Sequence, residues 1–152
     1  MDENIQAADA ADGLKGKYLT FFLDDQCFGV DIQYVIEIIG IQGITKVPKV
    51  PSYICGIINL RGKVVPIIDM RLRFHKASRE FDKKTCIIVV EVANVTAGLI
   101  VDGVDEVEDI GDLNISEPPQ MDWDYSSNFL KGVAQRGEEF QLILDCDKVL
   151  NA

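Results

Sequence analysis

The 152-residue sequence predicts a mainly β protein built from two small β-barrels packed together, with one or a few short helices. Short runs of β-branched and aromatic residues alternate with turn residues, which is typical of β-barrels and β-sandwiches. The helical crossovers that a parallel α/β sheet requires are missing from the pattern. Two weak internal repeats indicate that a similar small barrel occurs twice.

An antiparallel hairpin is the first predicted element. Tyr18–Leu23 is aromatic and apolar enough for a buried strand. Gln26–Val30 follows after the turn residues Asp24-Asp25, so that the two runs are spaced for pairing.

The apolar spacing then changes from that of a strand to that of a helix. We expect one or two helical turns that begin after a capping Asp31 and end before Gly40. The i, i+3, i+4, i+7 pattern consists of Ile32, Val35, Ile36 and Ile39. Ile44–Pro51 contains two prolines and is therefore predicted to be an edge strand or an extended loop.

The clearest hairpin joins Ile54–Leu60 to Lys63–Asp69 through an Arg61-Gly62 turn. Pro66 cannot donate a backbone hydrogen bond, so we expect a bulge or a sheet edge in the second arm. Arg71–Lys84 is basic and predicted to be a loop that opens with a helical turn.

Two further hairpins complete the predicted fold. Cys86–Val92 and Ala97–Val101 flank a turn around Asn94. After the Pro118-Pro119 break, the last pair of strands and a terminal turn are expected over Phe129–Gln135, Glu139–Asp145 and Asp147–Leu150.

The first internal repeat joins an aromatic residue, an aliphatic residue, a glycine, an Arg-Gly turn and an aspartate in one order. In both copies the aspartate comes 13 residues after the glycine. The copies are Tyr53–Gly56 with Arg61-Gly62 and Asp69, and Phe129–Gly132 with Arg136-Gly137 and Asp145.

The second repeat has an offset of 69 residues and relates Tyr18–Leu23 to Ile87–Val92. The matching single positions are Gly29 and Gly98, Val35 and Val104, Glu37 and Glu106, and Ile38 and Val107. Two similar barrels would leave a natural groove along the line where they meet.

Composition restricts the class of protein. Hydrophobic residues make up 47% of the chain, enough for a buried core, whereas residues 1–16 read as a disordered acidic leader. A net charge of −10 disfavours nucleic acid and anionic membrane surfaces as partners. The four widely separated cysteines, without any Cys-x-x-Cys pair, are expected to be buried and reduced in a cytoplasmic protein.

Catalytic and ligand-binding motifs are missing from the sequence. The only histidine, His75, lies in the basic loop without a nucleophile beside it, so we expect no enzyme. Neither zinc-ligand spacing nor a phosphate-binding glycine loop occurs, and we expect no metal and no cofactor. The acidic run Asp102–Asp124 does not fit a calcium loop, and it reads either as solvated strand edges and loops or as a surface for a basic partner.

Several motifs resemble the CheW family, the coupling proteins of prokaryotic chemotaxis, over Lys17 to Leu150. The most specific is Asn-Leu-Arg-Gly followed by Val-Pro-Ile-x-Asp. The matching segments are Phe28–Ile32, Val35, Glu37-Ile38, Gly56–Gly62, Val65–Asp69, and Gly98 with Val101–Val104.

The resemblance implies two five-stranded, SH3-like β-barrels in residues 17–150, an arrangement that allows the barrels to exchange terminal strands. It also implies a scaffold that bridges the cytoplasmic tip of a methyl-accepting chemoreceptor and the regulatory domain of the histidine kinase CheA. Such a protein would be cytoplasmic, without inserting into the membrane, and would be recruited to receptor arrays.

The family pairs a glutamate with an arginine at the positions of Glu37 and Arg61. We expect this pair to fix the Asn59–Gly62 turn against the short helix and so to shape the receptor groove. Besides these, the resemblance points to an apolar receptor surface, most members of which also read as barrel core: Val35, Ile39, Gly56, Ile58, Leu60, Val101 and Val104. Gly56 and Gly62 also read as glycines that a turn or close packing requires.

Three alternatives stay open from the sequence. A coupling protein for an array that controls surface motility or development would have the same motifs. A small-molecule carrier could use the groove between the barrels, and ligand-induced shifts in melting temperature would reveal it. An enzyme is the weakest reading.

Overall fold

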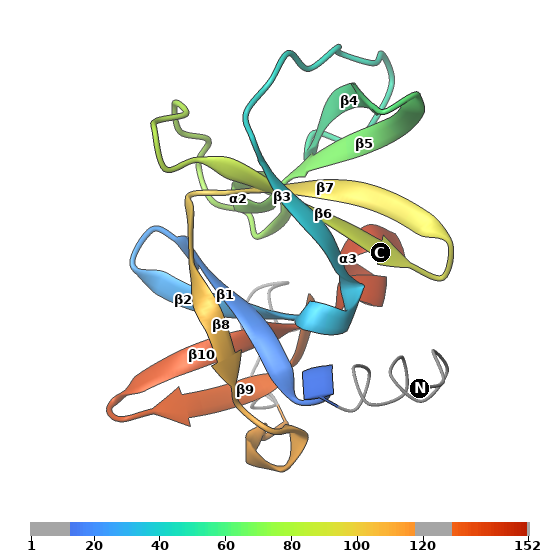
Figure 1. The fold of residues 1–152 in the computed structure, drawn as a ribbon. Coiled ribbons are helices and arrows are strands. Elements are labelled where there is room, and N and C mark those ends of the chain that lie inside the picture. Colours follow the sequence, from blue (N-terminus) through green and yellow to red (C-terminus); the bar gives the residue numbers. More distant parts are fainter. Residues whose placement is uncertain (1–12, 118–128, 152) are drawn as a thin grey trace, which may run out of the picture.

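The computed structural model describes residues 13–117 and 129–151, in which ten strands form two five-stranded sheets (Figure 1). Sheet A has the order β8-β1-β2-β10-β9 and contains β1 (Lys17–Leu23), β2 (Gln26–Asp31), β8 (Gly103–Asp109), β9 (Leu130–Arg136) and β10 (Glu139–Leu144). Sheet B has the order β3-β6-β7-β5-β4 and contains β3 (Val35–Gly40), β4 (Ile54–Leu60), β5 (Lys63–Asp69), β6 (Cys86–Val92) and β7 (Val95–Val101).

The helical elements are short, and the predicted mainly β fold class is confirmed. They are the 3-10 turns η1 (Ile32–Tyr34) and η2 (Asp112–Asn114) and the α-helices α2 (Met70–Arg73) and α3 (Cys146–Asn151). Asp69 caps α2, because its carboxylate accepts hydrogen bonds from the backbone N–H groups of Arg71 and Leu72. Within the described residues, no helix is long and apolar enough to cross a membrane.

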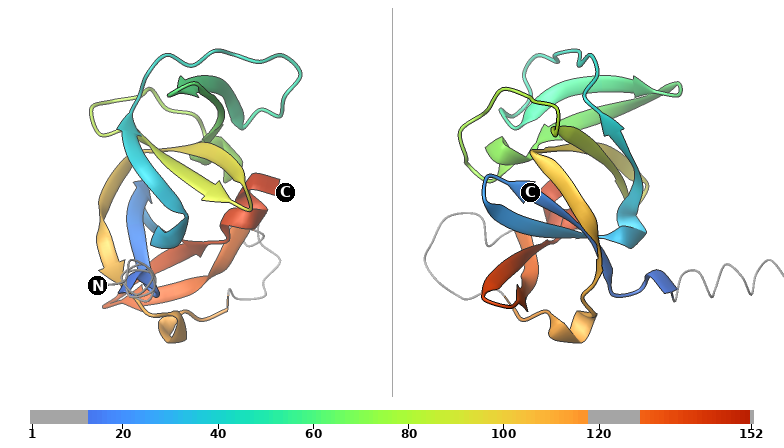
Figure 2. Two further views of the ribbon diagram at one scale, coloured as in Figure 1. Left: turned by 45° about the vertical axis from the view of Figure 1, so that its right-hand side comes forward. Right: turned by 60° about the vertical axis from the view of Figure 1, so that its left-hand side comes forward.

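The two sheets have the same topology, which agrees with the internal repeats. Strands β8, β1, β2, β10 and β9 of sheet A occupy the places of β3, β6, β7, β5 and β4 in sheet B. Each sheet contains one parallel pair, β2 with β10 and β7 with β5. Sheet A combines strands from both ends of the chain, whereas sheet B comes from its middle (Figures 1 and 2).

In each sheet, one isolated β-bridge connects the two edges, so that the curved sheet approaches a barrel. Thr45 follows β3 and exchanges two backbone hydrogen bonds with Ile57 of β4, at the opposite edge of sheet B. Ser116 follows β8 and pairs in the same way with Val133 of β9. Apart from these contacts the two edges of each sheet stay unpaired in the described chain, so the barrels are open.

Three apolar clusters form the core. The largest lies between the two sheets and includes Phe21 and Phe28 from sheet A together with Ile88 and Leu99 from sheet B. A second cluster fills the interior of sheet B, and a smaller third one lies inside sheet A. Strands between the clusters bury both faces, which explains uninterrupted apolar runs such as residues 86–90.

The helix expected up to Gly40 is wrong. Only Ile32–Tyr34 forms a 3-10 turn, which Asp31 caps through the N–H of Gln33, and Val35–Gly40 is a strand. This edge strand pairs with β6 and carries isoleucines on both faces. Taken together, its apolar residues have the same spacing along the sequence as one face of a helix. Tertiary pairing therefore overrides the local periodicity.

Pro66 does not mark an edge or a bulge of its own strand. β5 lies inside sheet B, between β4 and β7, and the irregularity is in β4 between Ile54 and Gly56. Pro66 is tolerated because it faces Ile57, whose backbone groups bond to Thr45 instead, and because pairing with β7 begins only at Ile67.

The four predicted hairpins are confirmed, as is the helical turn after Asp69. Ile44–Pro51 is a loop, one of the two expected forms, with a single bridge at Thr45 and a turn at Pro48-Lys49. The predicted break at Pro118-Pro119 and most of the leader lie outside the described residues. The cysteines are free, but only Cys146 is buried, whereas the other three are half-buried.

Candidate partner-binding site

A bidentate ion pair joins Glu37 on edge strand β3 to Arg61 in the β4–β5 turn. The two guanidinium nitrogens of Arg61 lie 2.8 and 2.5 Å from the carboxylate oxygens of Glu37. These hydrogen bonds lower the pKa of Glu37 and raise that of Arg61. Because β3 and β4 are the two edges of sheet B, the pair spans the opening of this barrel.

The turn that presents Arg61 is locally determined. Arg61 and Gly62 both have positive φ angles, +53° and +84°, as a two-residue hairpin of type I′ requires. The side-chain oxygen of Asn59 accepts a hydrogen bond of 2.7 Å from the N–H of Gly62. The predicted Asn59–Gly62 turn is thus present, but Glu37 approaches it from a strand, not from a short helix.

The apolar residues expected to bind the receptor do not form one surface. Val35 of β3 and Val104 of β8 are half-buried and pack on the cluster between the sheets. Ile39 and Leu60 are half-buried against the cluster inside sheet B. The remaining three are buried and contribute no accessible side chain to a groove, namely Gly56, Ile58 and Val101.

Exposed apolar residues on β3 and the turn before it were not among the expected site residues. Ile36 and Ile38 are 48% and 45% exposed, and Tyr34 is 38% exposed. Ile36 and Ile38 alternate with Glu37 along β3, so they lie on the face of the strand opposite to the ion pair. The apolar spacing of this segment predicts a helix and therefore does not predict these exposed residues. A strand places alternate residues on opposite faces and so exposes Ile36 and Ile38.

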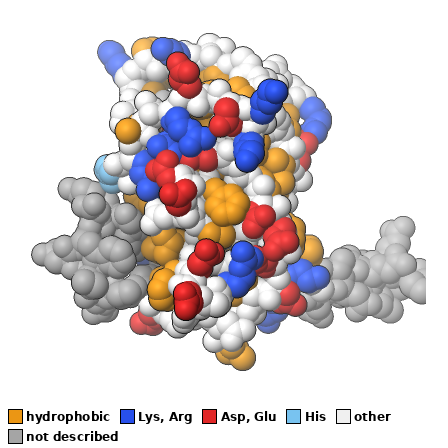
Figure 3. All heavy atoms as spheres, turned by 90° about the vertical axis from the view of Figure 1, so that its left-hand side faces the viewer, with side chains coloured by type: hydrophobic (Ala, Val, Ile, Leu, Met, Phe, Trp, Pro, Cys, Tyr) orange, Lys and Arg blue, Asp and Glu red, His pale blue; other side chains and the backbone are white. Residues whose placement is uncertain are grey.

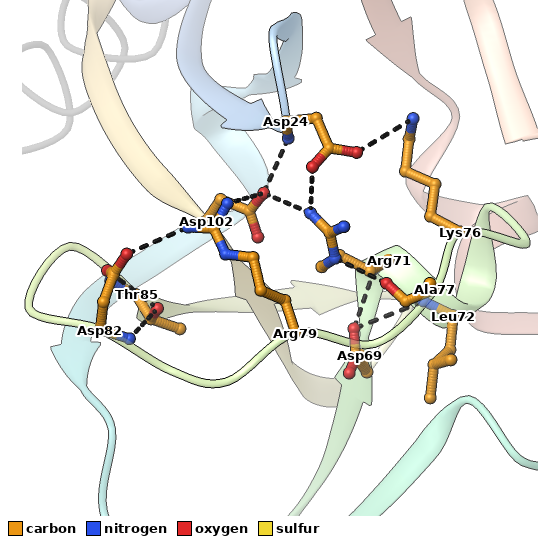
Figure 4. Close-up of polar contacts among 10 residues, drawn as sticks. All are labelled: Asp24, Asp69, Arg71, Leu72, Lys76, Ala77, Arg79, Asp82, Thr85 and Asp102. Atoms are coloured by element: carbon orange, nitrogen blue, oxygen red, sulfur yellow. Dashed lines mark hydrogen bonds and ion pairs between the residues drawn. The ribbon is translucent and has the colours of Figure 1, made fainter.

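A second group of charges connects the two barrels and is called here the ion cluster: Asp24, Arg71, Lys76, Arg79, Asp82 and Asp102 (Figure 4). One nitrogen of Arg71 lies 2.6 Å from Asp24 and 2.7 Å from Asp102. Asp102 also accepts a 2.7 Å hydrogen bond from the N–H of Asp24. Asp24 lies in the β1–β2 turn, Arg71 in α2, and Asp102 where the chain passes from sheet B to sheet A.

Acid is expected to weaken the ion cluster. The hydrogen bond from Arg71 holds the pKa of Asp24 below its ordinary value of 3.8. A carboxyl with a lowered folded-state pKa contributes stability that is present above the unfolded pKa and is lost as pH falls through the folded one. We expect the free energy of unfolding to fall between about pH 5 and pH 3, and less steeply in Asp24→Asn.

Urea unfolding at several pH values measures this dependence. Asp25→Asn, in the same turn, is the matched control. Its free energy of unfolding should depend on pH as steeply as that of the wild type. Equal slopes for wild type and Asp24→Asn would contradict the assignment.

Charges of both signs are interspersed on the face shown in Figure 3, with apolar side chains between them. This mixture agrees with the local pairing within the ion cluster. His75 is exposed and has a positive φ of +59°.

Comparisons with known proteins agree with the fold. The family model described as "CheW-like domain" matches residues 17–152. The chain is 32% identical over 136 residues to the "Chemotaxis protein CheW" of Klebsiella aerogenes, covering 90% of this chain and 82% of that protein. It is 34% identical over 131 residues to the protein of the same name from Rhizobium meliloti, covering 86% and 84%.

A solved structure has the same fold. The chain resembles the crystal structure of the scaffolding protein TtCheW from Thermoanaerobacter tengcongensis with a TM-score of 0.82 and 37% sequence identity. The likeness covers 91% of this chain and 89% of the solved one.

Proposed function

Because the chain belongs to the family of CheW-like domains, we propose that it couples chemoreceptor tips to the regulatory domain of a CheA-type histidine kinase. The two relatives described above are named for chemotaxis, and the solved structure that the chain resembles is named a scaffolding protein. The proposed coupling is non-enzymatic and takes place in the cytoplasm, at arrays of membrane-bound receptors. The partners are the methyl-accepting receptor tip and the kinase domain.

The observation that carries the proposal is the bidentate pair between Glu37 and Arg61. Its two hydrogen bonds fix the tip of the β4–β5 hairpin relative to β3. Arg61 remains 70% exposed, so its guanidinium can still contact a partner. A rigid turn that presents an exposed charge is suited to the polar side of an amphipathic helical hairpin, which a receptor tip presents.

The receptor surface proposed here differs in composition from the residues expected from sequence. It keeps Glu37, Asn59, Arg61 and Gly62, with Val35 and Val104 at the margin of the cluster between the sheets. Gly56, Ile58 and Val101 support it from within, because their positions are buried.

Charge reversal at Arg61 is expected to weaken receptor binding roughly tenfold or more, equivalent to about 1.4 kcal/mol. The replaced side chain would repel Glu37 and release the turn. Calorimetric titration with a purified receptor-tip fragment, and separately with the kinase regulatory domain, measures both affinities. Arg61→Glu should alter the receptor isotherm and leave the kinase isotherm unchanged.

Two variants make this experiment specific. Arg136→Glu places the same change in the equivalent turn of sheet A and should leave receptor binding intact. The exchange Glu37→Arg with Arg61→Glu restores a pair of opposite charges and should recover part of the affinity. If Arg61→Glu bound the receptor fragment as tightly as the wild type, the ion pair would not be part of the receptor site. If the wild type gave no heat of binding with either partner, the coupling role would be refuted.

A further inference from the structure

A pocket of about 490 Å³ lies on sheet A, between the end of β8 and the hairpin of β9 and β10. Its volume falls within the ~300–1,000 Å³ of typical ligand sites. Its lining includes Glu108, Asp109, Gln135, Arg136, Phe140 and Gln141. None of them belongs to the receptor surface proposed above, which lies mainly on sheet B.

The internal duplication shows that this pocket replaces part of the apolar interior found in sheet B. In sheet B the interior contains Ile58 and Val65, which face each other across β4 and β5. Their equivalents in sheet A are Ala134 and Gln141, which face each other across β9 and β10. The smaller alanine leaves space, and the buried glutamine introduces a polar group.

The edge strands differ in the same way. Ile39 of β3 packs on the interior of sheet B, whereas its equivalent on β8 is Glu108. Glu108 is only 13% exposed and accepts a hydrogen bond of 2.5 Å from the amide of Gln141. A charged residue held this far inside the barrel opening indicates a site that is built to be polar.

The edge of β9 offers unpaired backbone groups to the pocket. Val133 exchanges both of its hydrogen bonds with Ser116, so its backbone groups point away from β10. Gln135, two residues further, points the same way, because the direction alternates along a strand. The chain before Ser116 turns into η2, and Gln135 therefore has no backbone partner across the gap among the described residues.

The charge around the pocket is negative. The carboxylates of Asp105, Glu106 and Glu108 gather within 4.8 Å of one another, and Asp109 lines the pocket. Arg136 contacts Glu106 and Glu108 and supplies one positive charge against these four. The two segments outside the described residues, 1–12 and 118–128, contain acidic residues and no lysine or arginine, so this chain offers a poor occupant.

We propose that this pocket binds an extended, basic segment of a partner protein by strand addition to β9. The segment pairs its backbone with Gln135 and places a lysine or arginine beside Glu108 and Asp109. Its neighbouring side chain rests on Phe140, which is 60% exposed at the rim. The proposal goes beyond the coupling function, and its test requires neither receptor nor kinase.

The experiment uses the full, isotope-labelled chain and two-dimensional NMR. The probe is a capped octapeptide of alternating valine and lysine, and the counterpart has glutamate in place of lysine. We expect saturable shifts at Gln135, Glu108 and Phe140 with the lysine peptide and none with the glutamate peptide. Absence of saturable shifts, or shifts spread evenly over all acidic residues, would overturn the proposal.

Matched variants at Gln135 separate strand addition from simple charge attraction. Gln135→Pro removes the outward N–H without touching the β9–β10 ladder, since proline is tolerated at a sheet edge. It should weaken binding about tenfold or more, whereas Gln135→Ala should bind as wild type. If both variants bound the lysine peptide equally well, the proposed strand pairing at Gln135 would be refuted.

A second variant tests the charge without changing the backbone. Glu108→Gln preserves the shape of the side chain, keeps one of its two accepting oxygens and removes one negative charge. We expect it to weaken the lysine peptide several-fold while the spectrum stays folded. Unchanged affinity would overturn the role of Glu108, even if Gln135→Pro failed to fold.

Discussion

Replacing Arg71 by methionine is expected to lower the free energy of unfolding by about 3 kcal/mol. Arg71 and Asp102 keep only 12% of their side chains exposed, so Asp102 would be left largely desolvated with its nearest cation at 3.7 Å. Methionine preserves most of the apolar stem. The melting temperature should fall by roughly 6–12 °C, measured by calorimetry or circular dichroism.

Arg79→Met, in the loop that follows α2, is the matched control for Arg71→Met. Arg79 is 43% exposed and pairs mainly with Asp82, three residues away, at 3.0 Å. We expect its loss to cost less than about 1 kcal/mol, as for most surface ion pairs. Similar effects of the two substitutions would show that the ion cluster does not fix one barrel against the other.

Replacing Gly56 by alanine is expected to destabilise the protein by about 3 kcal/mol. A Cβ at this position would lie 2.1 Å from the backbone oxygen of Thr45. The φ of +148° is also unfavourable for any residue with a side chain. The clash is with backbone atoms of Thr45, which the bridge to Ile57 holds in place, so no movement of a side chain can relieve it.

Chemical denaturation of Gly56→Ala, with Gly40→Ala for comparison, measures this effect. Gly40 lies at the end of β3, and a Cβ added there would meet no atom within 4 Å, so its substitution should change stability by less than about 0.5 kcal/mol. If Gly56→Ala were as stable as wild type and lost only partner binding, Gly56 would be a contact residue after all.

Local sequence predicts a hairpin well wherever its turn and both strands are neighbours in the chain. Arg61 with Gly62 and Ala93 with Asn94 adopt positive φ angles in two-residue turns, and the apolar runs on each side pair as expected. The resemblance also identified Glu37 and Arg61 as partners. It could not specify which apolar side chains remain exposed, since this depends on how the strands pack.

The sequence alone therefore determined the mainly β class, the hairpins, the repeats and the Glu37–Arg61 pair. Only the tertiary structure decided that Val35–Gly40 is a strand, that β8 lies in the acidic run, and that sheet A joins both ends of the chain. The physical reason is that edge strands and barrel openings are defined by contacts between distant residues. Arg71 reaches Asp24 across 47 positions, and no local pattern encodes such a distance.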